Sequence, residues 1–391
     1  MWERLVGQAP AISVLKRAAG GHGMTHAWLI TGPPGSGRSN AAIAFAAALH
    51  CQHSGTDLAG CGRCQGCRTT LAGSHADLTV CRTEKLSLGV DDVRELVRSA
   101  ALAPVGDRWQ IMVVEDADRL TDSSGNALLK AIEEPTARTI WLLCAPTVED
   151  VLPTIRSRCR LLTLATPTAE AVARFLSAGG VEPGVAAYAA RASQGHIGRA
   201  KALAHDDETR ARRRQVVSIP ARLRTIGDCM TAAASLTESS QEEADAITSG
   251  LDVSDKVDLD AAYGVVERGR RPREYAPALA AMERSNKLRA KRRRLDMVDR
   301  GLMDLVSVYR DAIALSIDER AELVNEELRQ EVAQLAAEAP PEVHLRRIET
   351  IFAAREQLLE FNVPTLLALE GMMVGLWEAG ERSPHSTPGG S

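Results

Sequence analysis

Aromatic residues are scarce in this sequence: Phe, Trp and Tyr make up 3% of its 391 residues. The core must therefore be packed mainly from Ala, Leu, Val and Ile, which favours a helix-rich architecture. No apolar run reaches the roughly 18–20 residues that a membrane-spanning helix needs. The N-terminus also lacks the basic and apolar regions of a signal peptide. We therefore expect a cytoplasmic protein without membrane contact.

An excess of positive charge is also missing. The formal net charge is −4 at pH 7, which argues against a protein that binds nucleic acid alone over a broad surface. The hydrophobic content of 45% and the charged content of 25% are ordinary for a soluble globular protein. Because 391 residues are too many for one ordinary core, two or three domains are expected.

The first part of the sequence alternates short apolar runs with amphipathic stretches. The runs are short enough to be buried strands, and they lie at 28–31, 78–81, 111–114, 140–144 and 161–164. Such alternation predicts a parallel sheet covered by helices on both faces. Strand signals stop after residue 164. We therefore predict an α/β P-loop domain over 1–164, a small helical lid over 165–206, an all-α domain over 207–381 and a disordered tail over 382–391.

Two local patterns add detail to the helical parts. Thr168 is expected to cap a helix that begins near Ala169, because its hydroxyl can accept an amide of the first turn. Farther along, an apolar stripe at helical spacing predicts core packing within the last domain, and it consists of Leu302, Leu305, Val306 and Tyr309.

A glycine-rich loop follows the first predicted strand and opens the next helix. Glycines in this layout let backbone amides close around phosphates, and the helix N-terminus adds a favourable dipole. The candidate nucleotide-binding residues here are Gly32, Gly35, Gly37, Arg38 and Ser39. A P-loop has Lys where Arg38 stands, and a wide planar guanidinium is a poor substitute for that compact charge. The loop can still hold a phosphate, but its geometry for hydrolysis is unfavourable. A chance Gly-rich turn is the alternative.

Glu115 and Asp116 follow the apolar run 111–114, in the position of a Walker B motif. P-loop motor ATPases use Asp and then Glu here, for magnesium and for activating water. The reverse order moves each carboxylate by about one methylene, and displacements near 1 Å can cost about 100-fold in rate. We interpret these residues as a degenerate nucleotide site, at which ATP and magnesium can bind but hydrolysis is doubtful. The alternative is a solvated acidic pair at a strand end.

Four of the eight cysteines lie close together, at Cys51, Cys61, Cys64 and Cys67. Two-residue spacers let neighbouring thiolates converge on one tetrahedral ion, and four thiolates leave no open position. The spacing therefore predicts a structural zinc site in an insert over about 51–67. A redox Cys-x-x-Cys pair and unliganded cysteines are the alternatives. His53 and His75 flank the site, but the spacing does not require them as ligands.

Taken together, these motifs resemble the bacterial clamp-loader AAA+ subunits of DNA polymerase III. The resemblance is strong over residues 1–205 and thinner afterward. The cysteine insert directly after the P-loop helix is characteristic of these loaders. Further segments similar to the family are Val6-Gly7-Gln8, His26-Ala27-Trp28-Leu29, the helix Asn126–Pro135, Ser157-Arg158-Cys159 and the stretch 362–370.

The resemblance implies a three-domain subunit of the DNA-directed DNA polymerase III holoenzyme, in which the last domain is part of a helical collar. Such subunits form a hetero-pentameric ring of gamma/tau and delta-type members, which opens the sliding clamp and places it on primed DNA during replication. In the family, the arginine of the Ser-Arg-Cys motif reaches into the ATP site of the adjacent subunit. Arg158 is therefore expected to be an arginine finger in trans, although a plain surface arginine is the alternative.

Departures from the family's motor pattern indicate which kind of subunit this is. Motor subunits carry a sensing arginine where Gly198 stands here, with Arg199 one place late. Together with Arg38 and the inverted acidic pair, this favours a subunit that does not hydrolyse ATP by itself. An active motor of the gamma/tau type is the alternative, and a zinc-knuckle nucleic-acid-binding protein is a third hypothesis.

The run Lys287–Arg294 is the one dense basic patch. Most such runs are solvated helix faces, and a grip on DNA or a partner is the sharper option. No aromatics interleave with it, so stacking on single strands is not expected.

Overall fold

The computed structural model describes the chain except for residues 54–59, 84–86, 107, 263–274, 362 and 382–391. The predicted disordered tail, part of the cysteine insert and residue 362 therefore lie outside the described residues. The chain forms two compact units, residues 1–205 and 206–391. None of the described helices is both long and apolar enough to span a bilayer.

The first unit contains a five-stranded parallel sheet with strand order β2-β3-β4-β1-β5. Every strand coincides with a run predicted from the sequence. Their bounds are β1 Ala27–Thr31, β2 Leu78–Cys81, β3 Gln110–Val114, β4 Thr139–Ala145 and β5 Arg160–Thr163. Strands β1, β3 and β4 are buried along their whole length, as expected when helices cover both faces. The predicted parallel sheet is confirmed.

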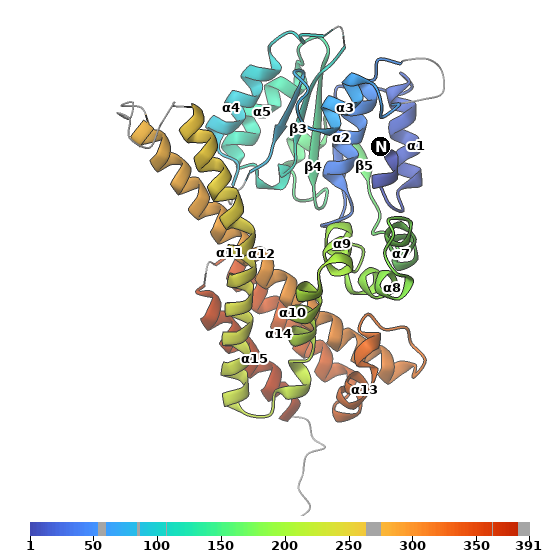
Figure 1. Cartoon of the computed structure of the whole chain (residues 1–391), viewed down its shortest axis with the longest axis vertical. Coiled ribbons are helices and arrows are strands. Elements are labelled where there is room, and N and C mark those ends of the chain that lie inside the picture. Colours follow the sequence, from blue (N-terminus) through green and yellow to red (C-terminus); the bar gives the residue numbers. More distant parts are fainter. Residues whose placement is uncertain (54–59, 84–86, 107, 263–274, 362, 382–391) are drawn as a thin grey trace, which may run out of the picture. The chain divides into compact units, whose positions relative to one another are not determined.

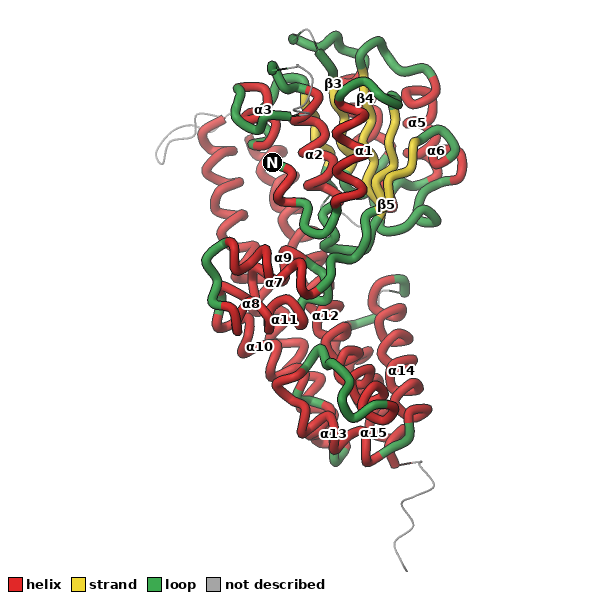
Figure 2. The backbone as a smooth tube through the Cα atoms, turned by 90° about the vertical axis from the view of Figure 1, so that its right-hand side faces the viewer, coloured by secondary structure: helices red, strands yellow, loops and turns green. Residues whose placement is uncertain are grey.

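Helices α1 and α2 lie on one side of the sheet and α5 on the other (Figure 2). Alternate residues of each central strand belong to the two different apolar cores between sheet and helices. On one face, Trp28 and Ile30 join a core with α1 (Ala9–Ala19) and α2 (Arg38–Leu49). On the other face, Leu29 packs in a core with α4 (Val90–Ala100) and α5 (Asp122–Glu133). The shorter helices of this region are η1 Trp2–Arg4, α3 Gln65–Leu71, η2 Ala117–Arg119 and α6 Pro153–Arg156.

After β5 the described regular elements are all helices. The first unit ends with α7 (Ala169–Ala178), α8 (Pro183–Ala192) and α9 (Ile197–His205), which share a small apolar core. Thr168 caps α7 as predicted, since its hydroxyl oxygen accepts from the Ala171 amide at 3.2 Å. The division of this unit into an α/β domain and a lid near residue 164 stays a prediction.

The second unit is wholly helical in its described residues (Figure 1). Its helices are α10 Asp207–Val217, η3 Pro220–Arg222, α11 Ile226–Ala262, α12 Tyr275–Ile317, η4 Glu326–Leu328, α13 Arg329–Glu338, α14 Pro341–Leu359 and α15 Thr365–Glu381. The predicted stripe of Leu302, Leu305, Val306 and Tyr309 lies in the core that joins α11, α12, α14 and α15. Within-unit packing, as predicted, is its role.

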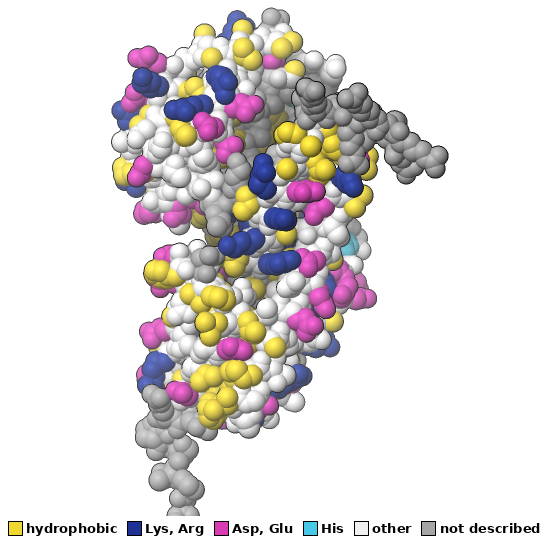
Figure 3. Space-filling view, turned by 90° about the vertical axis from the view of Figure 1, so that its left-hand side faces the viewer, with side chains coloured by type: hydrophobic (Ala, Val, Ile, Leu, Met, Phe, Trp, Pro, Cys, Tyr) yellow, Lys and Arg dark blue, Asp and Glu magenta, His cyan; other side chains and the backbone are white. Residues whose placement is uncertain are grey.

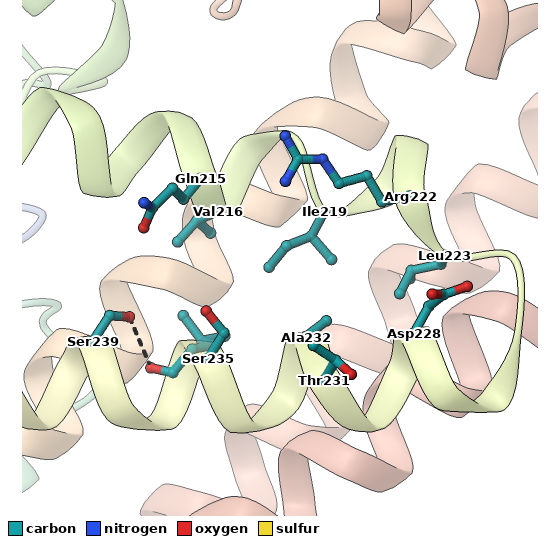
Figure 4. A pocket seen from close by; sticks show the side chains of 11 residues that line it. Gln215, Val216, Ile219, Arg222, Leu223, Asp228, Thr231, Ala232, Ser235 and Ser239 are labelled. Carbon is teal, nitrogen blue, oxygen red and sulfur yellow. Dashed lines mark hydrogen bonds between the residues drawn. The ribbon is translucent and has the colours of Figure 1, made fainter.

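A cavity of about 340 Å³ opens between the α10–η3 segment and the first turns of α11 (Figure 4). Its apolar wall includes Val216, Ile219 and Leu223, and Arg222 and Asp228 add charge. Neither the zinc-type cysteines nor the P-loop contributes to its lining.

Candidate functional site

The P-loop adopts the tight turn that its glycines permit. Gly35 and Gly37 have φ angles of +81° and +98°, which residues with side chains rarely adopt. The amide of Ile197, at the start of α9, donates to the Gly35 carbonyl at 3.2 Å. A Cβ atom on Gly35 would lie 2.2 Å from Cγ of His196. The loop thus packs directly against His196 and Ile197, so only glycine fits at position 35.

Arg38 turns its side chain back onto this loop. Its Nη1 donates to the Gly32 carbonyl at 2.7 Å. Ser39 lies beside it in the first turn of α2. Ser36 Oγ is buried and has no hydrogen-bond partner among the described residues. The guanidinium that stands in the place of the P-loop lysine is therefore engaged with the loop's own backbone.

The two Walker B carboxylates are held by the residues that follow β2. Glu115 forms an ion pair with Arg82, with 2.5 Å between Oε2 and Nε, and the Glu115 side chain is only 8% exposed. Asp116 Oδ2 accepts from the Thr83 amide at 3.3 Å, and Oδ1 lies 3.7 Å from Arg119 Nε. Both carboxylates, which a motor would offer to magnesium and water, are thus bound within the protein.

Charges gather at the carboxyl end of β4, beside the buried thiol of Cys144. Burial, and to a smaller extent the nearby carboxylate of Glu115, raises the pKa of this thiol to about 12. Burial also raises the pKa of Asp118, while Arg119 and Arg38 oppose that change. Arg38 and these acidic side chains thus influence one another electrostatically, as expected where the carboxyl ends of parallel strands meet.

Three of the predicted zinc ligands come together around one point. Ligand atoms of Cys51, His53, Cys61 and Cys64 all lie within 4.8 Å of one another. Cys51 follows α2, and Cys64 is the N-cap of α3. Thiolates and an imidazole at these separations form a donor set suited to tetrahedral zinc. The described residues therefore fit a structural zinc ion.

Backbone amides point at the sulfur atoms of this group. Cys61 Sγ accepts from the amides of Arg63 and Cys64 at 3.4 and 3.3 Å, and the Cys61 amide donates to Cys51 Sγ at 3.3 Å. The hydrogen bonds from Arg63 and Cys64 lower the pKa of Cys61 to about 5. The fold thus favours the thiolate form that a metal ligand requires.

Cys67 lies next to this group but differs from its members. Its side chain is fully buried, its Sγ donates to the Ala47 carbonyl at 3.2 Å, and burial raises its pKa. Its backbone amide donates to Cys64 Sγ at 3.5 Å. The fourth ligand is thus either Cys67, as predicted from the spacing, or His53. The sequence analysis noted His53 only as a flanking residue.

Arg158 lies on the surface, just after α6. Its Nη1 donates to the Thr154 carbonyl at 2.8 Å and to Ser157 Oγ at 3.1 Å. Its Nη2 lies 2.6 Å from Glu133 Oε1, and the two side chains are 40% and 41% exposed. The sequence analysis did not find this acidic partner. The guanidinium is thus oriented by Thr154 and Ser157 through Nη1 and by Glu133 through Nη2, and it remains partly exposed to solvent.

Family models match both units of the chain. One, described as DNA polymerase III, delta subunit, matches residues 7–168, and another, described as the C terminal part of the delta subunit, matches residues 296–377. The chain is 39% identical over 199 residues to DNA polymerase III subunit delta' of Escherichia coli strain K12, covering 50% of this chain and 58% of that relative. The chain belongs to the delta-prime subunits of the clamp-loader AAA+ family.

Subunits named gamma/tau are also similar to part of the chain. The DNA polymerase III subunit gamma/tau of Mycobacterium tuberculosis strain H37Rv is 36% identical over 155 residues, which is 39% of this chain and 27% of that protein. This delta-prime family member thus spans between about a quarter and three fifths of these relatives' lengths. Among solved structures, a gamma subunit-related protein of Thermotoga maritima aligns over 95% of this chain and 99% of its own, with 14% identity and a TM-score of 0.41.

Proposed function

We propose that this chain is the subunit of a DNA polymerase III clamp loader that supplies an arginine to a neighbour's ATP site and does not hydrolyse ATP itself. The observation that carries the proposal is a contrast between two groups of charges. Both groups are paired within the protein, but the Glu115 side chain is only 8% exposed, whereas the Arg158 side chain stays 40% exposed beside Glu133.

Internal pairing accounts for an inert cis pocket. Magnesium is held by carboxylate oxygens and by phosphate. Arg82 engages one oxygen of Glu115, and the Thr83 amide engages one oxygen of Asp116, which leaves fewer carboxylate lone pairs for magnesium. Charge-assisted hydrogen bonds of this kind are about twice as strong as neutral ones. Arg38, engaged with the Gly32 carbonyl, must also be released before it can contact a phosphate.

The arrangement around Arg158 suits action in trans. An arginine placed against a γ-phosphate offsets charge that develops during transfer, an effect of about 10³–10⁵ in rate. Contacts with Thr154 and Ser157 restrict Nη1, while the surface ion pair with Glu133 is weak enough to exchange for a phosphate. Glu133 therefore acts as a positioning residue that holds the guanidinium outward until a neighbour's nucleotide arrives.

The partners follow from the same proposal. They are the gamma/tau and delta subunits in a hetero-pentameric ring, the sliding clamp, and primed DNA reached through the complex. The helical second unit is the proposed collar element, over residues 207–381. Zinc, held by Cys51, Cys61 and Cys64 with either Cys67 or His53, orders the loop between α2 and β2 and takes no part in hydrolysis.

The direct test is a reconstituted loader carrying Arg158→Ala. Hydrolysis at the adjacent site, measured in a single turnover with the other sites disabled, is expected to fall by about 10³-fold or more. Arg156→Ala is the matched control, because Arg156 is also an exposed arginine and ends α6 only two residues before Arg158. Undiminished hydrolysis with Arg158→Ala, or an equal loss with the control, would remove the finger assignment.

A further inference from the structure

The two long helices of the second unit continue well past its apolar core. In that core, the α11 residues end at Leu236 and the α12 residues begin at Val298. The remaining lengths, residues 240–262 of α11 and 275–295 of α12, are here called the two-helix arm. The arm lies outside the residues matched by both family models, 7–168 and 296–377. Its role is therefore not supplied by those models.

Polar contacts hold the arm together. Arg289 is buried and pairs with Asp252, at 2.9 Å, and with Asp255. At the tip, the Tyr275 hydroxyl donates to Asp260 Oδ1 at 2.5 Å. Acidic residues of α11 thus face α12 and neutralise one side of its basic run. This accounts for part of the run Lys287–Arg294 as structural.

A second set of cations lies on another side of α12. At 3.6 residues per turn, positions i, i+3, i+7 and i+10 fall within one narrow face. On α12 these positions are occupied by four exposed cations, here called the basic stripe: Arg284, Lys287, Lys291 and Arg294. The buried Arg289 points to a different face, in agreement with this spacing. Figure 3 views the molecule from the side on which the arm lies in Figure 1, and shows a series of Lys and Arg side chains there, with Asp and Glu beside them.

We propose that the basic stripe binds the phosphodiester backbone of a nucleic acid. Ten residues of α-helix span about 15 Å. One strand of duplex DNA advances about 3.4 Å along its axis per phosphate, so about four phosphates of a strand fall within the axial length of the stripe. The row of positive charge, its length and its exposure all fit that ligand.

Acidic neighbours limit this surface without cancelling it. Arg294 lies 3.0 Å from Asp245, with both side chains nearly half exposed, and such surface pairs are weak and exchange readily. Glu283 and Asp296 flank the stripe on α12. The net charge of the whole chain is −4, which disfavours binding of a polyanion over a broad surface. The proposed contact is therefore limited to the basic stripe. No aromatic residue lies in the run 284–294, so the contact is independent of base sequence and depends on salt.

The test uses the full chain and a fluorescently labelled DNA duplex, with anisotropy measured at several salt concentrations. Four phosphate contacts predict a logarithmic salt slope near −3.6, so the affinity falls by about 100-fold between 50 and 200 mM salt. The stripe variant replaces all four cations by glutamine: Arg284→Gln, Lys287→Gln, Lys291→Gln and Arg294→Gln. It is expected to lose this binding and its salt slope.

A matched variant removes the same charge from exposed arginines elsewhere in the second unit: Arg214→Gln, Arg310→Gln, Arg320→Gln and Arg346→Gln. This control is expected to keep the salt slope, and thermal unfolding of both variants checks that they fold. The proposal is overturned if the unaltered chain does not bind at 50 mM salt, if the stripe variant binds as well as the unaltered chain, or if both variants lose affinity equally. None of these outcomes depends on Arg158 or on hydrolysis, so this test is separate from that of the proposed function.

Discussion

The charged side chains at the P-loop and the Arg158 side chain are all paired within the protein, but they differ in exposure. In the pocket, Arg38 contacts the Gly32 carbonyl and Glu115 is paired with Arg82. At the surface, Arg158 is held by Glu133 at 40% exposure. The comparison teaches that pairing alone does not determine which charge can reach another molecule, because exposure differs as well. The Glu115 side chain is 8% exposed, whereas that of Arg158 is 40% exposed.

The largest expected effect comes from changing the chemistry of the finger while keeping its charge. Arg158→Lys retains one positive charge but loses the planar fork that contacts Ser157, Thr154 and Glu133 together. We expect single-turnover hydrolysis at the neighbouring site to fall by about 10²-fold, between the unaltered complex and Arg158→Ala. Full activity with lysine would mean that charge alone suffices and that the geometry at Arg158 is irrelevant.

A second prediction concerns the cysteine group, in which Cys51 and Cys64 are buried but His53 is exposed. His53→Ala and Cys67→Ser each remove one candidate fourth ligand. We expect one of them to lower the retained zinc by at least about tenfold, because loss of a group that supports a metal site typically costs about 10–100-fold in metal affinity. The retained zinc is measured by metal analysis after dialysis against a chelator. Cys81→Ser, at the end of β2 and outside the metal cluster, is the control. Full retention of zinc in the two candidate variants would contradict the four-ligand site.

A smaller effect is expected at Glu133. Half-exposed ion pairs contribute about 0.2–1 kcal/mol, so Glu133→Gln should change hydrolysis at the neighbouring site by about two- to fivefold. The change should disappear when Arg158 is already alanine, because Glu133 is proposed to act through that side chain alone. If Glu133→Gln has the same effect with and without Arg158, the positioning role is wrong. Glu134→Gln is the control for the loss of an adjacent charge.

The smallest expected effect is in the cis pocket. Glu115→Gln keeps the shape of the side chain and removes its negative charge, so it weakens the pair with Arg82. ATP hydrolysis by the complex should stay within about twofold of the unaltered value, because the pocket is proposed to be inert. A loss as large as that from a motor-site mutation would give the pocket a catalytic role and remove the contrast with Arg158.

Periodicity and spacing predicted the strands well because buried parallel strands need continuous apolar runs, and all five predicted runs became strands. The Thr168 cap and the core stripe on α12 followed from equally local rules. What the sequence could not provide were pairings between distant residues. Arg82 lies 33 positions before Glu115, and Glu133 lies 25 before Arg158, so no local pattern joins them.

The cysteine group shows the same limit at shorter range. Spacing correctly brought Cys51, Cys61 and Cys64 together. The position of His53 depends on how the chain leaves α2, and a spacer count does not determine that path. Likewise, the basic run could be divided into a buried arginine and an exposed stripe only once α11 was in place beside it.

The central claim is that this chain helps a neighbour's ATPase site and does not run one of its own. It is tested most directly by ATP turnover in a reconstituted complex whose other nucleotide sites are all disabled, with Arg38→Ala as the companion variant. The account predicts no turnover above background in either complex. Sustained turnover that disappears with Arg38→Ala would contradict it.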